Sequence, residues 1–254
     1  MRIFGVIPAR MGSSRFPGKP LAPLMAMPIV CHVFHRSRMF GEFERLVVAT
    51  CDQEIEDAAT GCGAEAVTTS DRHERATDRV AEAIAVLDLR PAPDDLIVMV
   101  QGDEVFVSPE MIGNVVAAYK PTDNVAVVNL ASRLSRPEDF ADANTVKVAI
   151  APDGRALYFS RSPIPSQSRE SAAPIYQQTG LMAFPAKFLS EFARLPSTPL
   201  ERIESVDLLR LLENGHRVQM VKTEIETIGI DTPEDLARAE TMMRHDPLVS
   251  EYIT

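Results

Sequence analysis

The chain has 254 residues, of which 45% are hydrophobic and 24% charged, values that are ordinary for a globular protein with a sizeable core. Its net charge of −10 excludes general binding to nucleic acid, which needs a cationic surface. The three cysteines, Cys31, Cys51 and Cys62, fit neither a metal-ligand pattern nor a disulfide framework. We find no apolar stretch long enough to span a bilayer and no signal sequence, so we expect a cytoplasmic protein without membrane contacts.

In the first half of the chain, short apolar runs alternate with segments of helical periodicity. The runs predict buried parallel strands at 3–7, 45–50, 64–69 and 95–104. Apolar residues at helical spacing predict helices at 28–40, 52–63, 75–89 and 108–120, the last with Ser108 as its N-cap. This alternation is typical of a parallel sheet covered by helices.

The second half is less regular, and its hairpin predicts an antiparallel extension of the sheet. Alternating segments predict strands at 124–134, 176–185 and 217–224, and a hairpin over 145–165 that turns at Asp153-Gly154. The polar segment 166–174 could be a mobile lid. One helix is expected over 198–215, and a strand followed by a helix capped by Thr232 over 228–245. The whole pattern predicts a single domain, 1–254, with a three-layer α/β architecture and a mostly parallel mixed sheet with an antiparallel extension.

A cationic segment follows the first strand. After Pro8 it carries three cations among small residues, namely Arg10, Arg15 and Lys19 with Gly12, Ser13, Ser14 and Gly18. Backbone N–H groups and cationic side chains suit a chain of phosphates, so the segment is a candidate site for a nucleoside triphosphate. It is neither a Walker loop nor a dinucleotide fingerprint. A solvated surface loop is the alternative, and spacing alone does not decide between the two.

Acidic residues follow two other predicted strands. Gln101, Asp103 and Glu104 come where the run 95–104 ends, and Asp231 follows a second apolar run. Carboxylates in such places are natural Mg²⁺ ligands beside phosphates, although each could also be a turn or helix-capping residue. Two carboxylates opposite one cationic loop could hold a metal–triphosphate for in-line attack at phosphorus.

Two further arginines are candidates for binding an anion. Arg79 lies in the first turn of a predicted helix, and Arg161 follows Ser160 at the end of the hairpin. Each could bind a carboxylate or a phosphate with two N–H groups, and a solvated or salt-bridged side chain is the alternative for each. The histidines show no metal spacing, and we find no Ser-His-Asp or reactive-cysteine pattern.

Several motifs, in order and nearly from end to end, resemble one enzyme family. They are "IPARMGSSRFPGKPL", "VATCDQEI", "ATDRVAEA", "VQGDE", "VKV", "ALYFSRSPIP", "STPLERIES…LRLLENG" and "GIDTPEDL". Together they resemble the 3-deoxy-manno-octulosonate (Kdo) cytidylyltransferases, or CMP-Kdo synthetases. The first motif alone would also admit the CMP-sialic acid synthetases.

The resemblance implies a Rossmann-like nucleotidyltransferase, usually a homodimer, that needs Mg²⁺. Such an enzyme transfers CMP from CTP to the anomeric hydroxyl of a 2-keto sugar acid and releases pyrophosphate, making a CMP-sugar for surface polysaccharide such as lipopolysaccharide. The hairpin-rich region at about 125–200 would serve sugar binding and dimerisation. The partners implied are therefore CTP, the sugar acid and a second copy of the chain.

The resemblance also implies roles for particular residues. The implied catalytic residues are Arg10, Lys19 and Asp103, and the implied Mg²⁺ ligands are Asp103 and Asp231. The implied nucleotide contacts are Pro8, Ala9, Arg10, Arg15, Lys19, Arg79 and Gln101. The implied sugar contacts are Gln101, Arg161, Gln178, Met182, Asp207 and Leu208, with Arg161 suited to the substrate carboxylate.

The chain departs from the family pattern mainly near the sugar. Arg75 and Ala76 stand for a Ser-Gly pair, Val105 for a Pro, Gln178 for a His, Met182 for a Tyr, Asp207 for a Glu and Leu208 for a Gln. Losing a Tyr hydroxyl and a Gln amide removes hydrogen bonds to a polyol, so we hypothesise that the pocket fits a modified or different 2-keto sugar acid, or binds Kdo less well. The alternatives are a nucleotidyltransferase with another acceptor or base, and a catalytically silent nucleotide-binding paralogue; the sequence leaves the acceptor sugar open.

Overall fold

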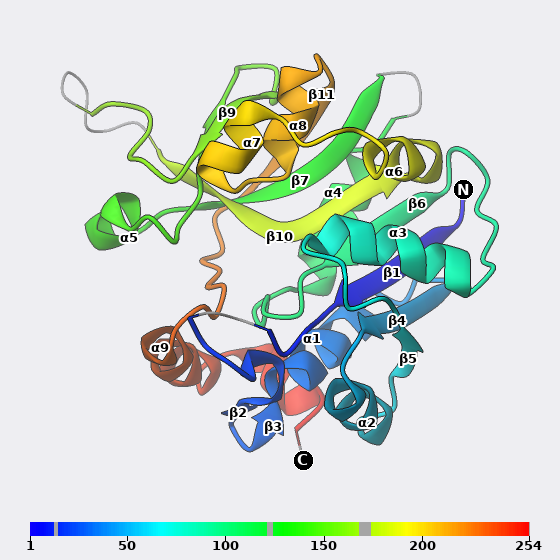
Figure 1. Cartoon of the computed structure of the whole chain (residues 1–254). Coiled ribbons are helices and arrows are strands. Elements are labelled where there is room, and N and C mark those ends of the chain that lie inside the picture. Colours follow the sequence, from blue (N-terminus) through cyan, green and yellow to red (C-terminus); the bar gives the residue numbers. More distant parts are fainter. Residues whose placement is uncertain (13–14, 121–123, 168–173, 254) are drawn as a thin grey trace.

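A computed structural model describes residues 1–12, 15–120, 124–167 and 174–253. A central mixed sheet runs through the molecule, with helices on both of its faces (Figure 1). Among the described residues, nine strands form this sheet, and seven of them follow the order β11-β7-β10-β6-β1-β4-β5. The predicted α/β fold class, with parallel and antiparallel parts, is confirmed.

The strands divide into a parallel part and an antiparallel part. β1 pairs in parallel with β4 and β6, β4 with β5, and β11 with β7. β10 is antiparallel to β6, β7 and β8, and β8 is antiparallel to β9. The strands are β1 (Ile3–Pro8), β4 (Arg45–Thr50), β5 (Glu65–Thr68), β6 (Leu96–Val100), β7 (Val125–Arg133), β8 (Lys147–Ile150), β9 (Ala156–Ser160), β10 (Tyr176–Pro185) and β11 (Arg217–Thr223), beside a small hairpin of β2 (Pro23–Leu24) and β3 (Met27–Pro28).

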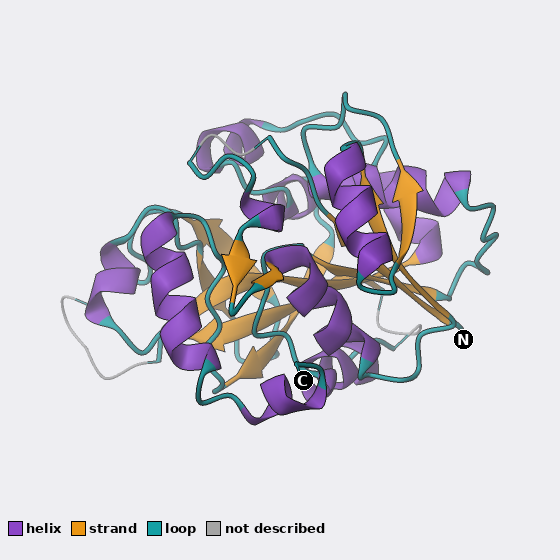
Figure 2. Cartoon of the chain, turned by 90° about the horizontal axis from the view of Figure 1, so that it is seen from below, coloured by secondary structure: helices purple, strands orange, loops and turns teal. Residues whose placement is uncertain are grey.

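Helices cover the two faces of the sheet (Figure 2), and the buried side chains between helices and sheet form two apolar layers. One layer holds residues of α1 (Ile29–Arg38), α2 (Gln53–Gly61), α4 (Pro109–Ala117) and α9 (Pro233–Met243). The other layer holds residues of α3 (Ala76–Val86), α6 (Ala186–Phe192) and α8 (Leu208–Glu213). Shorter elements are α5 (Pro137–Ala141), α7 (Pro199–Glu204) and the 3₁₀ helices η1 (Lys19–Leu21) and η3 (Pro247–Glu251).

The continuous apolar run in β6 follows from this layering. Leu96, Val98 and Val100 enter one layer, while Ile97 and Met99 enter the other. Because successive side chains of a strand point to opposite faces, a strand buried on both faces must be apolar throughout. Within the described residues, no helix combines the length and the apolar character needed to cross a membrane.

Two expectations about the second half are wrong. The helix expected over 198–215 is two helices, α7 and α8, because Ser205 adopts a left-handed backbone (φ 52°, ψ 49°) that ends α7. The strand expected at 228–231 does not form, and the apolar pattern there reflects burial of Ile228 and Ile230 in the core. The suggested lid at 166–174 lies mostly outside the described residues.

The sheet brings the ends of β1 and β6 to one edge, beside an irregular segment of β10. The register of β10 against β7 shifts between Gln178 and Met182. The buried Asn129 side chain of β7 donates to the carbonyls of Thr179 and Leu181, both at 2.9 Å. This segment therefore has a fixed shape next to the carboxyl end of β6, where ligands of open α/β sheets bind.

Candidate active site

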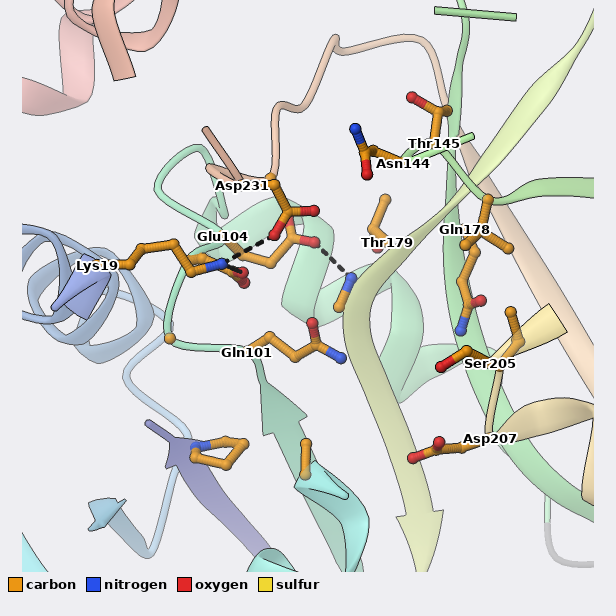
Figure 3. A pocket seen from close by; sticks show the side chains of 18 of the residues that line it. Lys19, Gln101, Glu104, Asn144, Thr145, Gln178, Thr179, Ser205, Asp207 and Asp231 are labelled. Carbon is orange, nitrogen blue, oxygen red and sulfur yellow. Dashed lines mark hydrogen bonds and ion pairs between the residues drawn. The ribbon is translucent and has the colours of Figure 1, made fainter. Parts of the chain in front are cut away.

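A pocket of about 500 Å³ opens at the carboxyl ends of β1 and β6. Its wall also includes the irregular part of β10, the turn between α7 and α8, and the segment that leads into α9. Figure 3 shows side chains from all of these elements pointing into one space. Segments far apart in the sequence therefore meet here, as expected from the parallel part of the sheet.

Hydrogen bonds hold the described parts of the loop after β1, at Met11 and at Gly18. The Met11 N–H donates to the Asp52 carboxylate at 2.7 Å, and the Gly18 N–H donates to the Met11 carbonyl at 3.2 Å. Lys19 then begins η1. Both later cations line the pocket, Lys19 largely buried and Arg15 exposed at its edge.

Two of these cations meet two carboxylates. Lys19 Nζ lies 2.5 Å from Asp103 Oδ2 and 3.1 Å from Asp231 Oδ1, and Arg15 Nη2 lies 3.0 Å from the same Asp231 oxygen (Figure 3 shows Lys19 and Asp231). Burial alone would lower the pKa of Lys19, but the two carboxylates outweigh it and raise that pKa. Lys19 therefore stays charged between the two acids.

Local structure positions both carboxylates. Asp103 follows Gly102, where a Cβ would lie 3.0 Å from the Pro8 carbonyl oxygen, so a side chain there would push the two strand ends apart. Asp231 precedes the capping box of α9, in which Thr232 and Asp235 bond each other's backbone N–H groups. The Asp235 carboxylate also accepts the N–H of Asp231 at 3.1 Å.

The two carboxylates fit a magnesium ion. They converge on one small cation, the Lys19 ammonium, so their oxygens already lie around a common point. No group of three or more His, Cys, Asp or Glu suited to a metal occurs among the described residues. Mg²⁺ commonly takes one or two protein carboxylates and completes its shell with phosphates and water, which matches this donor set.

The predicted nucleotide contacts gather at the end of β1. Pro8, Ala9 and Arg10 line the pocket, and Arg10 Nη1 donates to the His73 carbonyl at 3.3 Å. The Ala9 N–H is used inside the sheet, where it donates to the Ala49 carbonyl. Arg79 also lines the pocket, although it is buried and its guanidinium donates to Thr69 and Ser70.

The predicted sugar contacts gather across β6 and β10. The amides of Gln101 and Gln178 point into the pocket (Figure 3), and Met182 lines it. Gly180 sits between them, and a Cβ there would lie 2.6 Å from the Gln101 Cβ. This glycine therefore allows the close approach of β10 to the end of β6.

Arg161, Asp207 and Leu208 have different surroundings. Arg161 lines the pocket, but its guanidinium donates to four backbone carbonyls, those of Ala143, Asn144, Glu204 and Ser205. Burial lowers the pKa of Arg161, and Arg15 lowers it further. Asp207 points into the pocket (Figure 3), whereas the Leu208 side chain is fully buried in the core and does not line the pocket.

The structure gives defined surroundings to Glu104, one of the acidic residues that the sequence places after a strand, and to Lys147, to which the sequence assigned no role. Glu104 is buried, accepts the Gly180 N–H, and has its pKa raised to about 7, mainly by burial. Lys147 is also buried, and its ammonium donates to the carbonyls of Asp142, Thr145 and Arg161 at 2.6 to 2.8 Å. A charged residue inside an apolar run, as in "VKV", was the available signal for Lys147.

A nucleotide-binding α/β fold, with cations and two convergent carboxylates at the strand ends, defines the class as a nucleotidyltransferase-like protein. The family model described as "Cytidylyltransferase" matches residues 4–226. The chain belongs to this cytidylyltransferase family, so the predicted family resemblance and enzyme class are confirmed.

Similar proteins align with this chain along nearly its full length. The chain is 42% identical over 248 residues to a 3-deoxy-manno-octulosonate cytidylyltransferase of Syntrophobacter fumaroxidans, covering 97% of this chain and 98% of that one. It is 37% identical over 246 residues to the mitochondrial enzyme of the same description from Arabidopsis thaliana, covering 96% and 83%. A solved CMP:2-keto-3-deoxy-manno-octonic acid synthetase complexed with CTP is 32% identical, with a TM-score of 0.85, covering 96% of this chain and 99% of that one.

Proposed function

We propose that this enzyme transfers CMP from CTP to the anomeric hydroxyl of Kdo or a Kdo-like 2-keto sugar acid, with Mg²⁺, and releases pyrophosphate. The observation that carries the proposal is the meeting of Lys19, Asp103 and Asp231 at the strand ends, beside the loop after β1. The relatives named for the same reaction, and the solved relative with CTP, support the nucleotide and the acceptor class.

The reaction joins two halves of the pocket. The anomeric oxygen bonds to the α-phosphorus and its hydroxyl proton passes to solvent, while the bond from the α-phosphorus to the oxygen that bridges to the β-phosphate breaks and pyrophosphate leaves. In the nucleotide half, Arg10, Arg15 and Lys19 supply positive charge for the phosphates and for the departing pyrophosphate. In the acceptor half, Gln101 and Gln178 offer amides that can orient hydroxyls of the sugar.

Magnesium, if bound as proposed, would be held by Asp103 and Asp231 and would supply charge neutralisation at the phosphates. Lys19 forms ion pairs with both acids, so its positive charge can offset their negative charges when the phosphates bind. The chain itself then contributes mainly positioning and a preorganised electrostatic field.

The cellular setting implied by the family is also part of the proposal. We expect a cytoplasmic homodimer that supplies a CMP-sugar for lipopolysaccharide. Sedimentation equilibrium of the purified protein checks the dimer, and a monomer at micromolar concentration would contradict it.

A substrate screen tests the proposed reaction. Purified protein is assayed for pyrophosphate release with CTP, UTP, ATP or GTP, each with Kdo, a sialic acid or no acceptor, with and without Mg²⁺. We expect release only with CTP, a 2-keto sugar acid and Mg²⁺. Equal release with any nucleotide, or release that does not need an acceptor, would contradict the proposal. Poor turnover of Kdo beside efficient turnover of another 2-keto sugar acid would support the hypothesis of an altered acceptor pocket.

A further inference from the structure

Arg75 and Asp207 form an ion pair in the wall of the pocket. Arg75 is the N-cap residue of α3, and Asp207 is the N-cap residue of α8. Arg75 Nη1 lies 3.3 Å from Asp207 Oδ1 and donates to Ser205 Oγ at 3.3 Å. The pair therefore joins the segment leading into α3, which belongs to the nucleotide half, to the α7–α8 turn of the acceptor half.

The other acid near Arg75 already has a partner. Glu201 Oε1 is 4.0 Å from Arg75 Nε, but Arg210 binds Glu201 with two N–H groups, at 2.9 Å from Nε and 2.5 Å from Nη2. A fork-to-fork pair of this kind satisfies both charges. Asp207 is therefore the main ionic partner of Arg75.

Asp207 needs this charge because of where it lies. Burial raises the pKa of Asp207, and Glu201 raises it further, whereas Arg75, Arg210 and a hydrogen bond from Thr77 oppose the rise. The Thr77 hydroxyl donates to Asp207 Oδ2 at 3.2 Å, while Arg75 faces Oδ1. Both oxygens are thus held from the side of α3.

The carboxylate faces the space assigned to the acceptor. In Figure 3, Asp207 and the Ser205 hydroxyl point toward the same opening as the amides of Gln101 and Gln178. Arg75 and Asp207 are also two of the positions at which the chain departs from the family pattern. Their direct contact gives a physical reason for the two departures to occur together.

We propose that Arg75 is a positioning residue that holds the Asp207 carboxylate in place to accept a hydrogen bond from the sugar acid. The inference rests on the proposed function, because it concerns the acceptor half of the same pocket. A carboxylate donates no hydrogen bond, so the acceptor must present a hydroxyl or another donor at this point.

Steady-state kinetics test the inference. We expect Arg75→Gln to raise the KM for the sugar acid roughly tenfold, as for a lost hydrogen bond to a charged group, while kcat and the KM for CTP change less than about twofold. Arg75→Lys keeps the charge and should restore part of the loss. Arg72→Gln, a change at an exposed position of the same segment outside the pocket wall, is the matched control. An unchanged KM for the sugar acid, or an equal rise in the KM for CTP, would overturn the inference.

A double-mutant cycle separates this role from independent contacts. If Arg75 acts through Asp207, the Arg75→Gln/Asp207→Asn double variant should have nearly the same KM for the sugar acid as Asp207→Asn alone. If the two single substitutions instead raised the KM for the sugar acid by factors that multiply in the double variant, the two residues would act separately, and the inference would be overturned.

A measurement without acceptor distinguishes failure of this inference from failure of the proposed function. The ¹³C signal of the Asp207 carboxyl is titrated by NMR in the free protein. We expect Arg75→Gln to raise its midpoint by about one pH unit, because an opposite charge is removed. An unchanged midpoint would refute the role of Arg75 whatever the substrate is, whereas absence of turnover with every sugar acid contradicts only the proposed function.

Discussion

Lys19 lies between two carboxylates that would otherwise repel each other. Asp103 comes from the end of β6 and Asp231 from the segment before α9, so the tertiary fold alone brings them to one ammonium group. The same oxygens suit a hard divalent cation. At the scale of single residues, the site is therefore an arrangement of charges that suits the proposed phosphates and Mg²⁺.

Removing either carboxylate charge should abolish most activity. We expect Asp103→Asn and Asp231→Asn each to lower kcat/KM at least about 100-fold, because the proposed Mg²⁺ site loses one oxygen ligand and one negative charge. Circular dichroism should stay unchanged, since Asp103 lies just after β6 and Asp231 in the segment before α9, and neither side chain is in the core. Pyrophosphate release at saturating CTP measures the effect.

Glu234→Gln is the matched control for this prediction. Glu234 is exposed in the first turn of α9 and does not line the pocket, so its loss should change kcat/KM less than about twofold. Near-normal activity of both aspartate variants would argue against the metal role.

Residues that directly follow strands could be predicted from the sequence, and others could not. Asp103 ends the strongest apolar run, so its place at the sheet edge follows from the pattern. The bond from the Gly180 N–H to Glu104 depends instead on β10 lying beside β6, which no local pattern reveals. The surroundings of Arg161 were equally hidden, because its partners come from two distant segments.

At the scale of elements, the irregular part of β10 links the two halves of the pocket. The Gln101 N–H donates to the Gly180 carbonyl at 3.0 Å, and Asn129 fixes the carbonyls on either side of Gly180. The shape of this segment therefore sets where the Gln101 side chain can lie. A strand that carries such a bend beside a site acts as part of the site.

Adding one methyl group to this segment should disturb both stability and acceptor binding. In Gly180→Ala the new Cβ would lie 2.6 Å from the Gln101 Cβ and 2.8 Å from its Cγ, so Gln101 must move. We expect the free energy of unfolding to fall by about 1–3 kcal/mol, as for an overpacked site, and the KM for the sugar acid to rise. Urea unfolding and steady-state kinetics measure the two effects.

Gly113→Ala is a suitable control for that change. Gly113 lies within α4, and the nearest atom to its new Cβ is Phe40 Cε2 at 3.6 Å, an ordinary contact. Alanine in a helix should stabilise by about 0.5–1 kcal/mol relative to glycine. If Gly180→Ala behaved like this control, the close approach at Gln101 would be unimportant.

The break between α7 and α8 shows why element boundaries escape a sequence pattern. Helical spacing of apolar residues continues through 198–215, yet Ser205 is left-handed. Its hydroxyl accepts from Arg75 and its carbonyl from Arg161, two residues far away in the chain. Ser205 therefore adopts a left-handed conformation, which its own propensity does not favour, where two arginines of the pocket wall donate hydrogen bonds to it.

At the scale of the whole molecule, strand and helix alternation predicted the parallel half well. Apolar runs marked β1, β4 and β6 because they are buried on both faces. The sequence could not place β10 between β6 and β7, since antiparallel insertion depends on pairing rather than on periodicity. The sequence pattern also did not predict α5 and α6, because helices this short show too few turns for a helical spacing of apolar residues.

Ligand binding should stabilise the whole chain in a way that depends on both carboxylates. With CTP and Mg²⁺ at 100 times the dissociation constant, we expect about 2.7 kcal/mol of added stability. Thermal unfolding followed by circular dichroism measures the shift in Tm. CTP without Mg²⁺ should give a smaller shift, and the Asp231→Asn variant should lose the part due to Mg²⁺; an equal shift with ATP would argue against selection of cytosine.

The position of Asp231 in the chain has a consequence for biosynthesis. On the ribosome, the nine strands of the sheet that the structure describes, which end at Thr223, are synthesised before this carboxylate. The segment that brings it also delivers Ala239, Met243 and Val249 to the apolar layer. The strands of the sheet are therefore complete in sequence before the second of the two acids is made, so catalytic competence comes later in synthesis than the sheet that supports it.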